Sequence, residues 1–343
     1  MLETPGHTEN HVSYVVGHHG QASAVFSGGS LLYGAVGRTD LVADERTQHL
    51  THAQFRSARR LGELDPGAEL YPTHGFGSMC SAGGSSGATA STIGQEHKVN
   101  VALTQDDEEK FVADLLAGLT AYPAYYAHMG ARNAEGPTAA DLTPASPVDA
   151  DGIAKRIAAG EWVVDLRDRT AYASSHLAGT VGIALGQQFA TYLGWVSPWG
   201  TPLTLIGESP EQVADAQRQL VRIGIDRPAG AASGELADLA RGTELRGYPR
   251  RTFADLAHEP AAEVLDVRRD DERAGGGIAG STHVPLHSLL ARLDEVPAGR
   301  LWVHCAAGFR ASIAASLLDR AGRDVVFIDD EWEHAAQAGL QIV

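Results

Sequence analysis

The sequence is poor in cysteine, in aromatic residues and in basic residues. Two of its 343 residues are cysteines, Cys80 and Cys305, which is too few for a disulfide framework and fits a reducing, cytoplasmic location. Lys and Arg number 27 against 43 Asp and Glu, and the resulting charge of −16 argues against nucleic acid and anionic membranes as partners. No apolar run is long enough to span a bilayer, and the first ten residues lack the basic and apolar regions of a secretory signal.

The length allows two or three domains, each with its own core. A stretch rich in proline and alanine, residues 135–149, reads as a linker. We therefore expect three domains, at residues 1–140, 141–246 and 247–343.

The part of the chain after this linker repeats itself. Residues 163–185 align without a gap with residues 264–286, and each copy reads as a strand, a loop and helical segments. This alternation predicts two α/β domains with parallel sheets. In the second copy we expect Asp266 and Arg268 to form an ion pair that fixes the interior.

Residues 301–316 of the second copy carry the strongest chemical signal. A short apolar run predicts a strand, a helical run follows, and Cys305 starts the loop between them. The N-terminus of a helix and a nearby guanidinium both favour a thiolate. Gly308 would let the loop turn, and Arg310 offers a planar fork for an oxyanion. The alternative is an inert, buried structural cysteine.

This loop, C-x-x-G-x-R after a buried strand, resembles the active-site loop of rhodanese-type sulfurtransferases. The resemblance implies that Cys305 carries sulfur as a persulfide, that Arg310 assists it, and that the rest of the loop binds the persulfide. The residues of that persulfide loop are Ala306, Ala307, Gly308 and Phe309. The first copy has Gly207, Glu208 and Ser209 at the corresponding place, so we expect it to be a structural or docking module. His304 points to the other face of its strand and is a weak candidate for a base.

The first 140 residues contain most of the histidines. His7, Asp40 and His74 each lie within or just after a loop at the end of a predicted strand. Imidazole and carboxylate groups in such positions are typical ligands of zinc or iron. A helix is expected over residues 47–64, with an apolar face.

The segments TPGHT, GRTD and YPTH, which contain these three residues, resemble the C-terminal half of a metallo-β-lactamase αββα sandwich, in its persulfide dioxygenase and glyoxalase II branch. The resemblance implies one iron or zinc site. The family's H-x-H-x-D-H motif would precede TPGHT and is absent, so the metal site is expected to be incomplete. Either the true start lies upstream of Met1, which we favour, or the region is a remnant that leans on other domains or on a second chain.

The two resemblances together predict an enzyme of sulfur metabolism. Cys305 would transfer sulfur between thiosulfate or glutathione-type persulfides and small thiols, and the fused region would oxidise or hydrolyse a related substrate. Two alternatives stay open: a thioester metallohydrolase with regulatory rhodanese-like domains, and a non-catalytic assembly protein. The sequence leaves a homo-oligomer open.

Overall fold

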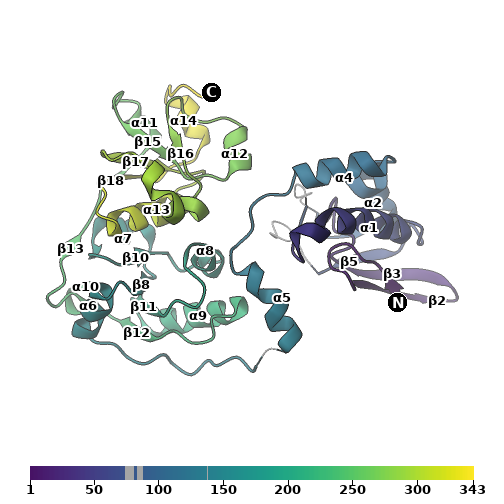
Figure 1. Ribbon diagram of the computed structural model, residues 1–343, viewed down its shortest axis with the longest axis horizontal. Helices are drawn as coiled ribbons and strands as arrows, with labels where there is room; N and C mark the ends of the chain where they lie inside the picture. The colour runs from purple at the N-terminus through teal and green to yellow at the C-terminus, as the bar shows by residue number, and fades with distance from the viewer. Residues whose placement is uncertain (74–80, 83–87, 137) are drawn as a thin grey trace. The chain divides into compact units, whose positions relative to one another are not determined.

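The computed structural model describes residues 1–73, 81–82, 88–136 and 138–343. The chain forms two compact units, unit 1 from Met1 to Tyr122 and unit 2 from Pro123 to Val343. The sequence predicted that the first domain ends at residue 140. Unit 1 ends earlier, because the helix α5 (Tyr126–Glu135) belongs to unit 2. Both repeats fall in unit 2 (Figure 1). We call residues 141–246 the first copy and residues 247–343 the second copy.

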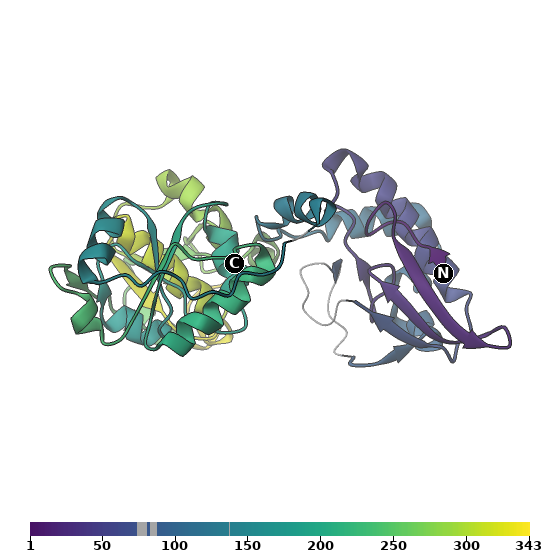
Figure 2. The ribbon, with the colours of Figure 1, turned by 90° about the horizontal axis from the view of Figure 1, so that it is seen from below.

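Unit 1 contains a mixed five-stranded sheet in the order β1-β2-β3-β5-β7. Only the β3–β5 pair is parallel, and the other neighbours are antiparallel. The hairpin between β2 and β3, purple in Figure 2, turns at His19 and Gly20, which both have positive φ. The strands are β1 (Leu2–Glu3), β2 (Val12–His18), β3 (Gln21–Gly28), β5 (Glu69–Pro72) and β7 (Ser91–Thr92), and a separate pair is formed by β4 (Val36–Gly37) and β6 (Ser81–Ala82).

Helices cover one face of this sheet. The predicted helix is present as α1 (Asp44–Gly62), with acidic residues in its first turn and basic residues in its last turn, as the helix dipole favours. Its Phe55 and Leu61 pack with Val25 and Leu70 of the sheet in one hydrophobic core. The other helices of unit 1 are α2 (Ile93–Val99), α3 (Val101–Thr104) and α4 (Glu108–Ala117). The side chains of Tyr14, Val16, Phe26 and Tyr71, also on the sheet, are instead exposed.

The first copy is built on a parallel sheet in the order β10-β8-β11-β12. A single parallel bridge between Pro147 and Ala231 continues the sheet beyond β12. The strands are β8 (Trp162–Asp165), β10 (Val181–Gly182), β11 (Leu203–Gly207) and β12 (Gly230–Ser233), with a small antiparallel pair of β9 (His176–Leu177) and β13 (Leu245–Arg246). The helices are α6 (Ala150–Ala158), α7 (Arg169–Ser174), α8 (Phe189–Val196), α9 (Pro210–Leu220), η1 (Val221–Ile223) and α10 (Leu236–Leu239).

The second copy has a parallel sheet in the equivalent order, β14-β18-β17-β15-β16. The strands are β14 (Arg250–Arg251), β15 (Glu263–Asp266), β16 (Thr282–His283), β17 (Leu301–His304) and β18 (Val325–Ile328). The helices are α11 (Phe253–Leu256), α12 (Asp270–Ala274), η2 (Leu286–Glu295), α13 (Phe309–Arg320) and α14 (Glu333–Gln337). The two sheets confirm the predicted α/β class with parallel strands.

The ion pair predicted at the start of the second copy is present, and the first copy has the same one. The Nη2 of Arg268 lies 2.7 Å from Oδ2 of Asp266, and the Nη2 of Arg167 lies 2.7 Å from Oδ2 of Asp165. Each carboxylate ends a buried strand, so its charge needs a partner in the interior. The arginine ties that strand to the turn that follows.

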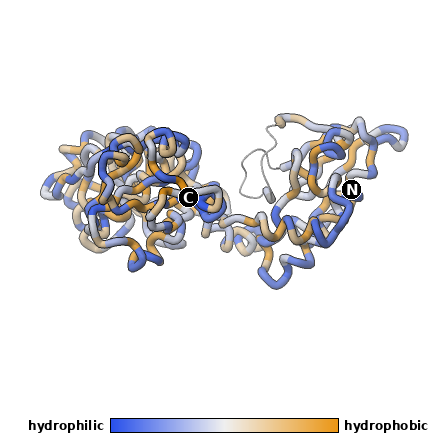
Figure 3. Tube along the Cα trace, turned by 90° about the horizontal axis from the view of Figure 1, so that it is seen from above, coloured by the Kyte–Doolittle hydropathy of each residue, from blue (hydrophilic) through white to orange (hydrophobic). Residues whose placement is uncertain are grey.

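Hydrophobic segments, orange in Figure 3, lie mostly inside each unit, as buried strands and helices require. Among the described residues, no helix combines the length and the apolar character that a membrane span needs.

Candidate functional site

The Cys305 loop lies between a fully buried strand and a long helix. All four residues of β17 are buried, and α13 begins at Phe309 and runs for 12 residues. The predicted strand, loop and helix are therefore present in this order. Cys305 itself is only 2% exposed. A thiol at this point is shielded from water but stands next to the start of a helix.

Gly308 makes the turn of the loop possible. Its φ is +80° and its ψ is −33°, a conformation that side chains with a Cβ rarely adopt. A Cβ placed on Gly308 would also lie 2.3 Å from Oδ1 of Asp329, a residue that follows β18. The turn that brings the chain from Cys305 into α13 therefore requires glycine at this position.

The N-terminus of α13 has no side chain that caps it. The main-chain carbonyls of the loop do have partners, because Ala306 O accepts from Trp332 N at 2.8 Å and Gly308 O accepts from Ser312 N at 2.9 Å. The first N–H groups of a helix find no acceptor within the helix. They are suited to hold a negatively charged sulfur in front of α13.

Arg310 lies in the first turn of α13 and is bound by a carboxylate. Its Nη1 and Nη2 donate to the two carboxylate oxygens of Glu272 at 2.5 and 2.7 Å. Burial lowers the pKa of Arg310, but the hydrogen bonds to Glu272 and the charge of that carboxylate outweigh burial and raise the pKa. The fork that the sequence suggested for an oxyanion is thus occupied by Glu272, which is distant in sequence. The guanidinium still acts on Cys305 through its charge.

Two aromatic residues of the first copy pack against the second copy near the Cys305 loop. Tyr192 of α8 meets the ring of Phe309 edge to face, with centroids 5.4 Å apart. Trp195, one helical turn later, stacks on His287 of η2 at 5.3 Å and 20° between planes. Burial raises the pKa of Tyr192, so its hydroxyl is neutral at pH 7. The copy without a cysteine therefore supplies part of the surroundings of the copy that has one.

His304, the last residue of β17, lies in the interior of the second copy. It is fully buried and its ring stacks on Trp332 at 5.4 Å. Burial lowers its pKa to about 4, although the charge of Asp266 raises it in part. Its Nε2 is 3.8 Å from Oδ2 of Asp266, too far for a hydrogen bond. A neutral, enclosed imidazole fits a structural role, in line with the weak case for a base.

The three predicted metal ligands do not form a described site. Asp40 is bound by Arg38, whose Nε and Nη2 donate to its two oxygens at 2.6 and 2.7 Å. His7 is buried, and its Nδ1 lies 2.8 Å from the carbonyl oxygen of Arg38. His74 lies outside the described residues, as does Cys80. In the described part of the chain, no three His, Cys, Asp or Glu residues lie close enough together to hold a metal ion. The roles of His7, Asp40 and His74 as metal ligands therefore stay predictions.

A comparison with protein families matches residues 250–338 to the rhodanese-like domain. This range contains the Cys305 loop and most of the second copy. Residues 250–338 form a rhodanese-like domain. The comparison with curated proteins gave no significant match.

Solved structures extend the comparison to unit 1. A metallo-beta-lactamase from Staphylococcus aureus subsp. aureus COL is 26% identical, with a TM-score of 0.58, and the match covers 68% of this chain. This chain spans 66% of the length of that protein, just under two thirds. Unit 1 is little more than a third of the chain, so the match extends beyond it into unit 2. The chain therefore joins a metallo-β-lactamase-fold region to rhodanese-like structure.

Two other solved structures are similar to parts of this chain. A rhodanese-related protein from Thermoplasma volcanium is 28% identical over 28% of this chain and 98% of its own, with a TM-score of 0.27. A thiosulfate sulfurtransferase from Pseudomonas aeruginosa is 22% identical over 58% of this chain and 43% of its own, also with a TM-score of 0.27.

The structure adds site residues that sequence reasoning missed. Glu272 is 38 residues before Arg310, and Tyr192 is more than a hundred residues before Cys305. One signal was available for Glu272, since it follows the strand of the rhodanese-like domain that ends at Asp266. Strands that are neighbours in a parallel sheet bring the loops at their carboxyl ends together. Nothing in the sequence indicates that α8 packs against this edge.

Proposed function

We propose that this protein is a sulfurtransferase in which Cys305 carries a sulfane sulfur as a persulfide. The observation that carries the proposal is the uncapped N-terminus of α13 directly behind a buried cysteine, inside the rhodanese-like domain. An uncapped helix start next to a guanidinium favours an anion at that place. Both the thiolate and the persulfide of Cys305 are such anions.

The reaction has two steps, each a displacement at sulfur. The thiolate of Cys305 attacks the outer sulfur of a donor such as thiosulfate, a new S–S bond forms on Cys305, and the donor's S–S or S–sulfonate bond breaks. With thiosulfate the leaving group is sulfite, which takes the bonding electron pair. The thiolate of a small acceptor then attacks the outer sulfur of the persulfide and releases Cys305 as a thiolate.

The residues around Cys305 support these steps in different ways. Burial of the sulfur keeps water from the persulfide. Main-chain N–H groups at the start of α13 are placed to hold the negative charge. Arg310 is fixed by Glu272, and its guanidinium interacts with Cys305 through its charge rather than by direct recognition. Glu272 is therefore a positioning residue.

We place this activity in the sulfur metabolism of the cytoplasm, with small thiols as acceptors. A persulfide dioxygenase-like or hydrolytic reaction in unit 1 would need iron or zinc to activate oxygen or water. His7 and Asp40 would be its ligands in this chain, but Asp40 is paired with Arg38. No step is therefore assigned to a metal here.

The test measures thiocyanate formed from thiosulfate and cyanide by the full chain. The wild-type protein should turn over, and Cys305→Ser should abolish turnover, because a hydroxyl cannot hold the sulfur. As a control, Ser209→Cys places a thiol at the start of α9 in the first copy. The double variant Cys305→Ser/Ser209→Cys should show no turnover, because Pro210 at the start of α9 has no N–H group that could donate to the new sulfur. Turnover that survives Cys305→Ser would refute the proposal, and a wild-type protein without turnover would favour an assembly role.

A further inference from the structure

The persulfide loop rests on the part of the chain that follows β18. We call residues 329–332 the supporting segment. Trp332 N donates to Ala306 O at 2.8 Å, and Ala307 forms an isolated antiparallel bridge with Glu331. These main-chain contacts hold two neighbouring residues of the loop against the supporting segment.

The side chain of Asp329 completes this support. A Cβ placed on Gly308 would lie 2.3 Å from Oδ1 of Asp329, so the carboxylate packs directly against the turn of the loop. The side chain of Asp329 is only 8% exposed. A carboxylate with so little access to water needs charged partners to stay in place.

Two arginines bind this carboxylate, and one of them belongs to the first copy. Arg169, the first residue of α7, donates from Nε to Oδ1 of Asp329 at 2.8 Å. Arg250, on β14 of the second copy, donates from Nη1 to Oδ2 at 3.2 Å. Arg169 is 34% exposed, whereas Arg250 is 55% exposed. The shorter and better shielded bond therefore comes from the copy without a thiol, and it goes to the oxygen that lies against the loop.

The repeat does not account for this ion pair. Arg169 aligns with Asp270 of the second copy, which is 78% exposed. Gly234, the residue after β12, takes the place that Asp329 has after β18. At these two positions the arginine occurs in the first copy and the carboxylate in the second. The pair thus serves the contact between the copies rather than the architecture of either.

Other contacts between the copies do not involve this pair. Nε2 of His176, which is fully buried in the first copy, lies 3.1 Å from Oδ2 of Asp319 on α13. Nη2 of Arg320, the next residue of α13, donates to Gly160 O at 2.9 Å. Loss of Arg169 should therefore leave the copies docked and act on the supporting segment.

We infer that Arg169 is a positioning residue for Cys305. It fixes the carboxylate of Asp329, and this carboxylate holds the persulfide loop in the conformation that presents main-chain N–H groups to the sulfur. The inference rests on the proposed function, because it concerns the same cysteine. It gives the copy without a thiol a part in the site, through one charged side chain.

Amide hydrogen exchange of the full chain, followed by mass spectrometry, tests the inference without any sulfur donor. In Arg169→Gln, peptides that contain Trp332 should exchange about fivefold faster, as the loss of a partly exposed ion pair allows. Peptides from β15 in the same sheet should exchange as in the wild-type protein, which separates local opening from a general loss of stability. Arg169→Lys should restore part of the protection, because lysine keeps the charge but not the planar fork.

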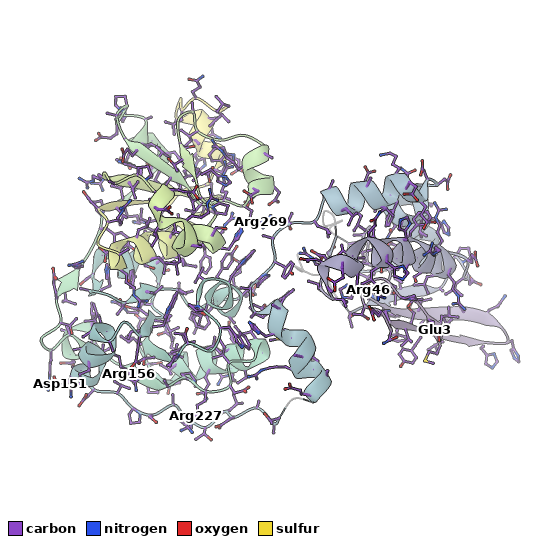
Figure 4. All side chains as sticks on the ribbon, viewed as in Figure 1. Glu3, Arg46, Asp151, Arg156, Arg227 and Arg269 are labelled. Carbon is purple, nitrogen blue, oxygen red and sulfur yellow. The ribbon has the colours of Figure 1, made fainter. Side chains whose placement is uncertain are left out.

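Arg156→Gln is the matched control. Arg156, labelled in Figure 4, lies on α6 of the first copy, is 26% exposed and binds Glu161 at 2.8 Å. It resembles Arg169 in exposure and in the length of its ion pair, but its partner lies outside the supporting segment. The control should leave the exchange of peptides that contain Trp332 unchanged.

Turnover of thiosulfate and cyanide gives the second readout. In Arg169→Gln the kcat should fall by about fivefold and the KM should change less, because the loop acts on the sulfur that Cys305 carries. In an Asp329→Asn background, Arg169→Gln should have no further effect, since the arginine acts through that carboxylate.

The outcomes separate the two levels of the proposal. A wild-type protein without turnover refutes the proposed function. If the wild-type protein turns over but Arg169→Gln leaves exchange and kcat unchanged, sulfur transfer stands and the role of Arg169 is overturned. The role is also overturned if Arg156→Gln has the same effect, or if Arg169→Gln acts equally in the Asp329→Asn background.

Discussion

The two copies in unit 2 share one topology and differ at one loop. Both have a parallel sheet with the same strand order, and both carry the buried Asp–Arg pair at the end of the first strand of the repeat. At the carboxyl ends of the neighbouring strands in the two sheets, β11 and β17, Gly207 of the first copy corresponds to Cys305 of the second. The scaffold is thus preserved where it supports the fold, and it differs where the chemistry is expected.

The starts of the two corresponding helices show what this difference does. In the first copy, Ser209 caps α9 by accepting from Gln212 N at 3.3 Å, and the Gln212 side chain accepts from Glu208 N at 2.7 Å. In the second copy, α13 has no such cap. The first loop supplies side-chain acceptors for its N–H groups, whereas the start of the second helix has no side-chain cap. The copy without the thiol is thus the copy in which the helix is capped.

The buried ion pairs should give the largest effect. Asp266→Asn should lower the free energy of unfolding of unit 2 by about 3–5 kcal/mol, because Arg268 would remain buried without a countercharge. Asp165→Asn should cost less, since Arg167 is 12% exposed against 3% for Arg268. Tryptophan fluorescence in urea measures this, as all five tryptophans lie in unit 2. Equal losses in the two variants would contradict the comparison.

A smaller effect should distinguish the copies by pH. His304 corresponds to the buried Ile206, so only the second copy has a titratable group there. The folded pKa of His304 is about 4, below its ordinary value of 6.5. The unfolded chain therefore takes up a proton first as the pH falls, and stability decreases between about pH 6.5 and pH 4.

At pH 5 this group should cost about 2 kcal/mol relative to neutral pH. His304→Ile, which reproduces the first copy, should remove that part of the pH dependence. Urea unfolding of both proteins at pH 7.5 and pH 5 measures it. A variant that loses as much stability at pH 5 as the wild-type protein would show that His304 is not the group responsible.

The helix cap should give the smallest effect. Ser209→Ala should destabilise unit 2 by about 1 kcal/mol, because Gln212 N loses its acceptor. Ser209→Gly should lower the free energy of unfolding by only about a few tenths of a kcal/mol, as is usual for glycine at an N-cap. Loading of Cys305 should be unchanged in both variants. A glycine variant less stable than the alanine variant would argue against a capping role.

Much of the fold was readable because the signals are local. The repeat predicted the two parallel sheets, and the apolar face of residues 47–64 predicted a helix found at Asp44–Gly62. Gly308 was expected to allow the turn, and its φ of +80° shows that it does. The sequence suggested that Arg310 binds an oxyanion directly. It did not reveal that the guanidinium is paired with Glu272, because Glu272 is far away in the chain.

The metal region shows the same limit. His7 and Asp40 were proposed as ligands from the types and spacing of residues, which do not reveal that Arg38, two residues before Asp40, turns back to bind its carboxylate. Whether this ion pair forms depends on the backbone conformation of the loop after Gly37, which sets where the side chains of Arg38 and Asp40 point. The roles of His7, Asp40 and His74 as ligands stay predictions.

The sequence by itself determined the repeated α/β architecture, the loop in which Cys305 lies and the absence of a thiol from the first copy, because periodicity, glycine and residue identity act over short distances. Only the tertiary structure decided which groups surround that cysteine. Glu272 reaches Arg310 from α12, the helix after β15, and Tyr192, which contacts Phe309, comes from α8 of the other copy. Such contacts depend on the packing of whole elements against one another, and no local pattern encodes them.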